Sequence, residues 1–136
     1  TEIYTLSLHD ALPISMMGIS AVPSSNPRWL GMEGMHGHYA SSIAQNEADL
    51  IITAGCRFSD RGTGNTAKYA RNAKIIHMDI DASELCKNIP VELGMTGSMK
   101  KILQKLAEKL PQQTHADWMA RVAELQEKTR ELERYQ

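Results

Sequence analysis

The chain has 136 residues, which suits one domain with a single core and leaves no room for a second domain. Its 15 Lys and Arg residues nearly balance its 16 Asp and Glu residues, so no overall field draws it to nucleic acid or to an anionic membrane. No apolar run reaches the roughly 18 residues that a membrane span needs. Cys56 and Cys86 lack the paired spacing of a zinc or redox motif. We expect a cytoplasmic protein whose two cysteines are small buried hydrophobes.

Residues 1–15 match the translation of a common sequencing adapter. We expect this leader to be artefactual and to pack on nothing, with a short amphipathic leader as the alternative. Its His9 and Asp10 therefore carry no catalytic interpretation. The main domain is expected over residues 16–111, truncated at both ends of the chain.

Glycine stands at every third position of the segment Gly31–Gly37. Without a Cβ, such a backbone can lie flat against a planar or diphosphate ligand. A mobile surface loop is the alternative. The residues alone favour an ordinary structural role for His36 over hydrogen bonding to a ligand.

Two short apolar runs, 49–55 and 74–79, indicate buried parallel strands. Helices are expected around them, over residues 39–47, 65–71 and 98–110. This alternation predicts an α/β fold, a Rossmann-like open parallel sheet with right-handed crossovers that lacks its first strands.

The expected helix over residues 98–110 has clear ends, because Ser98 suits an N-cap and Pro111 stops the helix. Its apolar face should cover the sheet. The pattern 62–67 formally fits the dinucleotide motif G-x-G-x-x-A, but no strand precedes it directly, so it predicts a loop and a helix start.

Residues 112–136 are expected to be a linker followed by a helix over residues 117–134. An apolar stripe with alternating spacings of four and three runs along this helix and must dock on something. Docking on its own domain or on a next domain is preferred to a free coiled coil. With a partner domain removed, we expect the stripe to be exposed and the chain to self-associate. The stripe consists of Trp118, Val122, Leu125, Thr129 and Leu132.

Residues 55–61 follow the first expected strand, where ligands bind in open parallel sheets. Gly55 allows close approach, and Arg57 and Arg61 offer guanidinium groups suited to a pyrophosphate. Asp60 can orient one of them. A solvated Arg-Asp-Arg loop is the alternative.

The acid at the end of the second expected strand, Asp79, lies where nucleotide folds place an acceptor for ribose hydroxyls. A helix cap or a loop charge is the alternative for an acid at this place.

Three motifs, at residues 34–37, 55–61 and 77–81, resemble in order and spacing the central domain of the acetolactate synthase (acetohydroxyacid synthase) large-subunit family. The resemblance covers about residues 16–136 and implies an FAD site. It places Asp60 and Arg61 near the mouth of the active-site channel. The cofactor-binding residues it implies are Met16, Met17, Gly34, Met35, His36, Gly37, Gly55, Cys56, Arg57, Ser59, Arg61, Asp79, Ile80 and Ser98.

For the whole protein, the resemblance implies a thiamine-diphosphate enzyme that joins pyruvate to a second 2-keto acid, pyruvate or 2-ketobutyrate, in branched-chain amino-acid biosynthesis. It implies thiamine diphosphate and Mg²⁺ in other domains, a homodimer or tetramer, and a regulatory small subunit. FAD would be structural, because the carboligation needs no net redox change. The chain has no Gly-Asp-Gly motif of thiamine enzymes. We therefore expect no catalytic residue, no metal site and no activity in this part alone.

The sequence also departs from the family pattern. Ser59 stands where Asp is frequent, and Gly97-Ser98 replaces a usual Gly-Asp pair. Related central domains hold ADP or nothing. The alternatives are another thiamine-diphosphate enzyme, of the glyoxylate carboligase or 2-keto acid decarboxylase type, and a stand-alone Rossmann-like nucleotide-binding or electron-transfer module.

Overall fold

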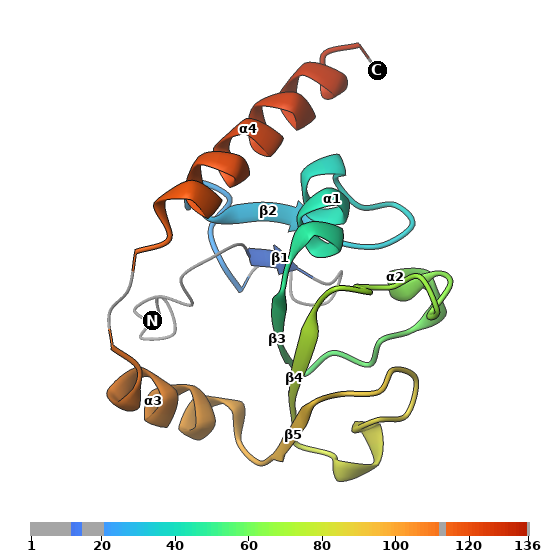
Figure 1. Ribbon diagram of the computed structural model, residues 1–136, viewed down its shortest axis with the longest axis vertical. Coiled ribbons are helices and arrows are strands. Elements are labelled where there is room, and N and C mark those ends of the chain that lie inside the picture. Colours follow the sequence, from blue (N-terminus) through green and yellow to red (C-terminus); the bar gives the residue numbers. More distant parts are fainter. Residues whose placement is uncertain (1–11, 15–20, 112–113, 136) are drawn as a thin grey trace.

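The structure is a computed structural model that describes residues 12–14, 21–111 and 114–135. The strands in these ranges form two parallel sheets, one of two strands in the order β1-β2 and one of three strands in the order β3-β4-β5 (Figure 1). They are β1 (Leu12–Ile14), β2 (Trp29–Met32), β3 (Leu50–Ala54), β4 (Lys74–Asp79) and β5 (Leu93–Thr96).

The two strands expected from the apolar runs are β3 and β4, and they pair in parallel from Leu50↔Lys74 to Ala54↔Met78. The open parallel α/β sheet is therefore confirmed. β4 lies in the middle of the three strands and is mostly buried. The expected burial of β3 is wrong, because β3 is an edge strand with one described neighbour, and Leu50 is 48% exposed.

Strand β1 corrects the expectation that residues 1–15 pack on nothing, because Leu12–Ile14 pair in parallel with β2. The pairing gives hydrogen-bond partners to an edge of β2 that would otherwise be unpaired. Its register shifts between Leu12 and Pro13, as suits a residue that has no N–H to donate. Residues 1–11 and 15 lie outside the described ranges.

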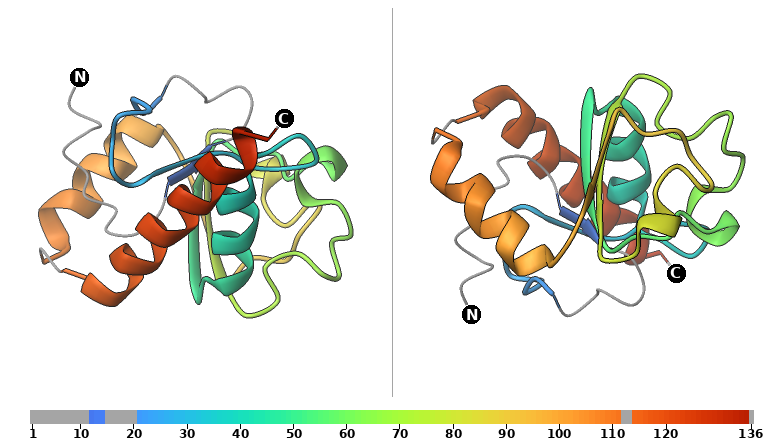
Figure 2. Two further views of the ribbon diagram at one scale, coloured as in Figure 1. Left: turned by 90° about the horizontal axis from the view of Figure 1, so that it is seen from above. Right: turned by 90° about the horizontal axis from the view of Figure 1, so that it is seen from below.

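Two of the expected helices form close to their expected bounds: α1 (Tyr39–Glu47) and α3 (Met99–Lys109). They lie on opposite sides of the three-stranded sheet (Figure 2). Ser98 is the N-cap of α3, but its side chain makes no capping hydrogen bond. The apolar face of α3 is only partly covered, since Leu103 is buried whereas Leu110 is 50% exposed.

The expected helix over residues 65–71 is wrong, because the segment forms successive turns. The Asn65 side chain accepts a hydrogen bond from the Ala67 N–H, a local bond that competes with helix formation. Ala70 then takes a left-handed conformation with φ +44, which a helix does not allow. The short helix α2 (Asp60–Thr63) and a 3-10 helix, η3 (Ala82–Glu84), were not expected.

The C-terminal helix α4 (Ala116–Glu133) packs on α1 and β2 of the same chain (Figure 1). Val122 and Leu125 are 0% and 2% exposed in a core shared with Leu30, Ala40 and Ala44. The expected exposure of the stripe is therefore wrong at its centre. Docking on its own domain, one of the two preferred alternatives, is what the structure contains.

Polar contacts fix the angle of α4. The Arg121 guanidinium donates to both carboxylate oxygens of Glu47 at 2.9 and 2.7 Å, and the Gln126 amide donates to the carbonyls of Pro27 and Trp29. The Ala40 N–H at the start of α1 donates to the Thr129 hydroxyl at 3.0 Å. These contacts join residues 27–47 to the last described segment of the chain.

A second core lies beneath the loops that follow β3 and β4, and it contains Phe58, Ala70, Ile75 and Ile89. Cys56 packs against this core and is half-buried. Cys86 is exposed, which corrects its expected burial, and it has a left-handed φ of +56 in the loop after η3.

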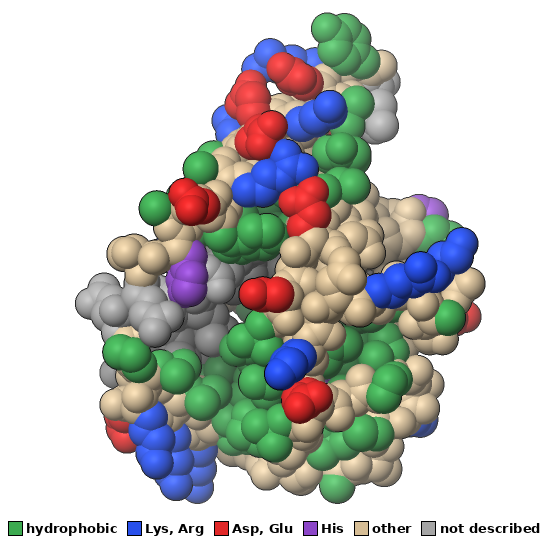
Figure 3. Space-filling model, viewed as in Figure 1, with side chains coloured by type: hydrophobic (Ala, Val, Ile, Leu, Met, Phe, Trp, Pro, Cys, Tyr) green, Lys and Arg blue, Asp and Glu red, His purple; other side chains and the backbone are tan. Residues whose placement is uncertain are grey.

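The surface in Figure 3 divides into two regions. Hydrophobic side chains gather over the three-stranded sheet beside α3, whereas α4 carries interspersed acidic and basic side chains. Among the described residues, no helix combines the length and the apolar character that crossing a membrane would require.

Candidate functional site at the strand ends

The carboxyl ends of the three strands meet at one edge of the sheet. The Gly55 N–H donates to the Met78 carbonyl at 2.8 Å, and the Gly97 N–H donates to the Asp79 carbonyl at 3.0 Å. Three loops therefore begin side by side, after β3, β4 and β5. In a parallel sheet this edge is where loops and helix starts converge to bind ligands.

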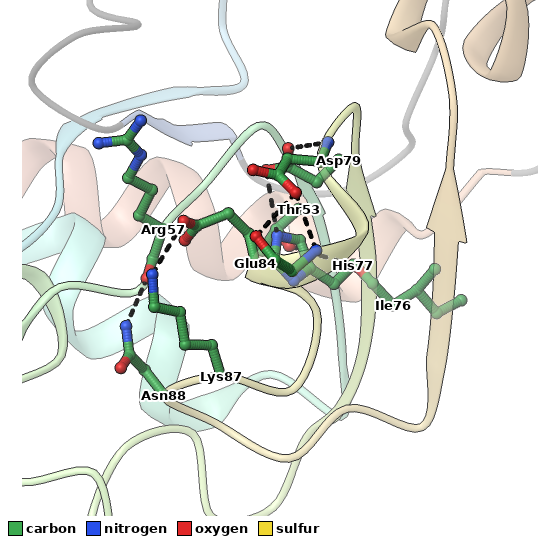
Figure 4. Close-up of polar contacts among 10 residues, drawn as sticks. Thr53, Arg57, Ile76, His77, Asp79, Glu84, Lys87 and Asn88 are labelled. Carbon is green, nitrogen blue, oxygen red and sulfur yellow. Dashed lines mark hydrogen bonds and ion pairs between the residues drawn. The ribbon is translucent and has the colours of Figure 1, made fainter.

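The loop after β3 begins with an open position. Gly55 has φ +65, and a Cβ built on it would meet no atom within 4 Å. Arg57 is exposed, and its carbonyl accepts a hydrogen bond from the Asn88 amide at 2.9 Å (Figure 4). The guanidinium groups of Arg57 and Arg61 form no ion pair with any described acid, so both can bind an anion.

Phe58 anchors this loop from below. It is 4% exposed, with a left-handed φ of +48 that costs about 1–3 kcal/mol and must be compensated by packing. Its ring packs edge-on against Tyr69, with centroids 5.8 Å apart, and against His77, with centroids 5.1 Å apart. The packing holds the flanking Arg57 at the surface.

The loop after β4 places Asp79 at the strand edge and Ile80 beyond it, 6% and 76% exposed. Asp79 Oδ1 accepts from the Asp81 N–H at 2.9 Å, and its Oδ2 lies 3.7 Å from His77 Nε2 (Figure 4). Asp81 has the alternative role of a cap: it accepts from the Ser83 N–H and hydroxyl, and these bonds lower the pKa of Asp81.

The glycine-rich loop between β2 and α1 reaches the same edge. The Met35 N–H donates to the Arg61 carbonyl at 2.9 Å, and a Cβ on Gly34 would lie 2.8 Å from that carbonyl oxygen. Met35 and His36 are exposed. Asp60 accepts from the backbone N–H of Arg61 and does not hold either guanidinium group, so its expected orienting role is not seen.

A half-buried cluster of titratable groups, Glu33, Cys56 and Tyr69, lies behind the glycine-rich loop. Burial raises the pKa of Glu33. Burial also raises the pKa of the Cys56 thiol, with further contributions from the charges of Glu33 and Asp79, while a hydrogen bond from the Phe58 backbone opposes it. Burial likewise raises the pKa of Tyr69. Cys56 is therefore a neutral thiol at pH 7, unsuited to nucleophilic chemistry.

The structure thus gathers the described members of the predicted cofactor set at one sheet edge, with Ser98 at the start of α3. Met16 and Met17 lie outside the described residues. Sequence reasoning missed Glu33, Phe58 and His77. The signal for His77 was present, because alternate residues of a strand share one face and His77 lies two positions before Asp79.

A separate cavity of about 570 Å³ lies between the loop before β2, the start of α1 and the end of α4. Trp29, His38 and Glu133 are among the residues that line it, with His38 Nε2 3.8 Å from a Glu133 carboxylate oxygen. None of the predicted cofactor residues lines this cavity.

The donor set at the sheet edge fits a nucleotide with a pyrophosphate. Arg57 and Arg61 supply unpaired cations, Gly55 leaves open space at the start of the same loop, and Asp79 supplies an acceptor for hydroxyl groups. Within the described ranges, no group of three or more His, Cys, Asp and Glu side chains is placed to hold a metal ion.

Residues 12–106 match the family model of the thiamine pyrophosphate enzyme central domain. The match begins at the first residue of β1.

Curated proteins that resemble the chain are acetolactate synthase large subunits. That of Haemophilus influenzae is 46% identical over 96 residues, which are 69% of the chain and 17% of the relative. Isozyme 3 of Escherichia coli is 38% identical over 76% of the chain and 18% of the relative. The probable large subunit of Methanocaldococcus jannaschii is 39% identical over 91% of the chain and 22% of the relative. The chain spans about a fifth of the length of these relatives.

Proposed function

The chain belongs to the family of thiamine pyrophosphate enzyme central domains, and we propose that it is the flavin-nucleotide-binding part of an acetolactate synthase large subunit. The observation that carries the proposal is that the loop beginning at the open Gly55 position holds two guanidinium groups without an ion-pair partner, Arg57 and Arg61, at the sheet edge where β4 ends in Asp79.

In this proposal, Arg57 and Arg61 bind the pyrophosphate of FAD, because planar guanidinium groups match phosphate oxygens with charge-assisted hydrogen bonds. Asp79 accepts hydrogen bonds from the ribose of the adenosine half, with Ile80 beside it. The glycine-rich loop, with Gly34, borders the flavin. Bound FAD supplies a planar, rigid group beside the active-site channel and no electron transfer, because the carboligation has no net redox change.

The proposal extends to the whole protein. The large subunit would join pyruvate to pyruvate or 2-ketobutyrate in branched-chain amino-acid biosynthesis, with thiamine diphosphate and Mg²⁺ held by its other domains. It would be a cytoplasmic homodimer or tetramer with a regulatory small subunit. Asp60 and Arg61 would lie near the mouth of the channel. The similarity to named large subunits supports this assignment.

The test is flavin retention by the full-length subunit that carries this chain. Arg57→Ala should weaken FAD roughly tenfold to a hundredfold, the equivalent of about 1.5 to 3 kcal/mol for one charge-assisted hydrogen bond. Arg57→Lys should recover only part of the loss, because an ammonium group is a point charge without the planar fork. Asp79→Asn should cost less than Arg57→Ala. Absorbance after desalting measures the retained flavin.

Two controls make this result specific. Arg71→Ala removes an exposed arginine away from the sheet edge, whose Nε donates to the Ala67 carbonyl, and should leave flavin binding unchanged. Thiamine diphosphate affinity is measured in every variant. Stoichiometric flavin in all three site variants, or an equal loss of thiamine diphosphate, would show that the clamp has been assigned to the wrong residues.

A further inference from the structure

The strongest unexplained feature of the molecule is His77 on β4. Its side chain is 0% exposed, and neither ring nitrogen has a hydrogen-bond partner among the described residues. A buried polar group without a partner costs about 1–3 kcal/mol. A leucine of similar volume would avoid that cost, so the imidazole needs a role that its polarity serves.

The surroundings of His77 point to that role. His77 and Asp79 alternate on β4 and therefore project from the same face of the sheet. His77 Nε2 lies 3.7 Å from Asp79 Oδ2, and in Figure 4 the two side chains extend toward one another. Phe58 packs edge-on against the imidazole at 5.1 Å and an interplanar angle of 79°, which restricts rotation of the ring.

The carboxylate of Asp79 is otherwise held on one side only. The backbone of Asp79 is fixed by the strand and by the Gly97 N–H, which donates to the Asp79 carbonyl. The carboxylate Oδ1 accepts from the Asp81 N–H. Within the described residues, Oδ2 has no other hydrogen-bond or ion-pair partner, and it faces His77. With Nε2 protonated, a small closure of the 3.7 Å gap would complete a second hydrogen bond, to Oδ2, and both oxygens would then be fixed.

We propose that His77 is a positioning residue, which acts through Asp79 and fixes the carboxylate in the orientation that accepts the ligand's ribose hydroxyls. The proposal rests on the proposed nucleotide function of this edge. His77 itself lies beneath the surface and touches no ligand. Each carboxylate oxygen has two lone pairs, so the lone pairs not used by Asp81 and His77 remain for the ribose. Pre-organisation of this kind improves affinity because no torsion has to be frozen when the ligand binds.

The test is a double-mutant cycle on FAD affinity in the full-length subunit, with His77→Leu, Asp79→Asn and the pair. His77→Leu alone should weaken FAD about twofold to tenfold, the range of one ordinary net hydrogen bond. In the Asp79→Asn background the same change should have almost no effect. His77→Gln, whose amide can donate from nearly the same place, should restore most of the affinity.

Because substitution of a buried residue can prevent folding, the unfolding midpoint of every variant is measured without FAD, and His77→Gln serves as the second variant. Equal losses of FAD affinity in both Asp79 backgrounds would mean a structural role and would overturn the proposal. So would an unchanged affinity in a folded His77→Leu variant while Asp79→Asn weakens binding. If neither Arg57→Ala nor Asp79→Asn affects FAD, the proposed function itself fails, and this inference fails with it.

Discussion

At the scale of single residues, the candidate site depends on two glycines with a positive φ, a backbone conformation that is unfavourable for a residue with a Cβ. Gly34 combines φ +103 with a neighbouring carbonyl, because a Cβ there would lie 2.8 Å from the Arg61 oxygen. Gly55 also has a positive φ, +65, but a Cβ there would meet nothing within 4 Å. The two glycines therefore separate conformational cost from steric cost.

Gly34→Ala should lower the free energy of unfolding by more than the about 1–2 kcal/mol that a left-handed backbone costs a residue with a Cβ. Gly55→Ala is the matched control and should lose about that conformational amount alone. Urea unfolding of the chain measures both. If both variants lose the same amount, the tight approach of the glycine-rich loop to Arg61 is not part of the folded state.

Glu33 should make the stability of the chain depend on pH. Burial raises the pKa of Glu33, so the folded state holds a proton that the unfolded state releases first. Its favourable contribution is complete below the unfolded pKa and is lost as pH rises through the folded pKa. Relative to Glu33→Gln, the native chain should therefore become less stable as the pH rises above about 4, the ordinary pKa of a glutamate. Urea unfolding at several pH values tests this, and a constant difference between the two proteins would contradict it.

At the scale of elements, α4 is part of the domain core and not an extension from it. Leu125 is 2% exposed between α1 and β2, whereas Leu132 on the same helix is 44% exposed. Leu125→Ala should lower the free energy of unfolding by about 2–5 kcal/mol, as cavity-forming substitutions do. Leu132→Ala, the control, should change it by less than about 0.5 kcal/mol. Equal small effects in urea unfolding would mean that α4 is undocked in solution.

The elements also show which features of the fold a sequence pattern can predict. The apolar runs located β3 and β4, and helical periodicity located α1, α3 and α4, because burial repeats with the period of each element. α4 docks on residues of β2 and α1 together, and no repeat in the sequence links those segments to α4. The docking partner of α4 therefore could not be derived from the sequence. The helix predicted over residues 65–71 does not form, because local hydrogen bonding by the Asn65 side chain outweighs the helix propensity of the segment.

The same limit applies to the site. The glycines and arginines of the loops, together with the position of Asp79 at a strand end, were enough to predict that the candidate site lies at the carboxyl edge of the sheet. The packing of Phe58 beneath the loop depends on a left-handed φ of +48, which no local sequence pattern predicts. The expected contact between Asp60 and an arginine side chain is not seen, because the Asp60 carboxylate accepts from the backbone N–H of Arg61 instead.

At the scale of the whole molecule, binding and catalysis should separate. The chain spans about a fifth of the acetolactate synthase large subunits that it resembles, and it matches a central domain. The residues proposed to bind FAD are all in this part, but the Gly-Asp-Gly motif that holds metal and diphosphate in thiamine enzymes is not in its sequence.

We therefore expect this chain, supplied with thiamine diphosphate, Mg²⁺, FAD and pyruvate, to form no acetolactate. A colorimetric assay for acetolactate measures this, with an intact acetolactate synthase large subunit in parallel as the positive control. The physical reason is that nothing in the proposed site would activate the thiazolium carbon. In the proposal its cations bind phosphate and its acid accepts from ribose, and its thiol is neutral. Acetolactate formation by the chain alone, abolished by Arg57→Ala, would mean that the sheet edge takes part in the chemistry itself, and the structural role proposed for its nucleotide would have to be abandoned.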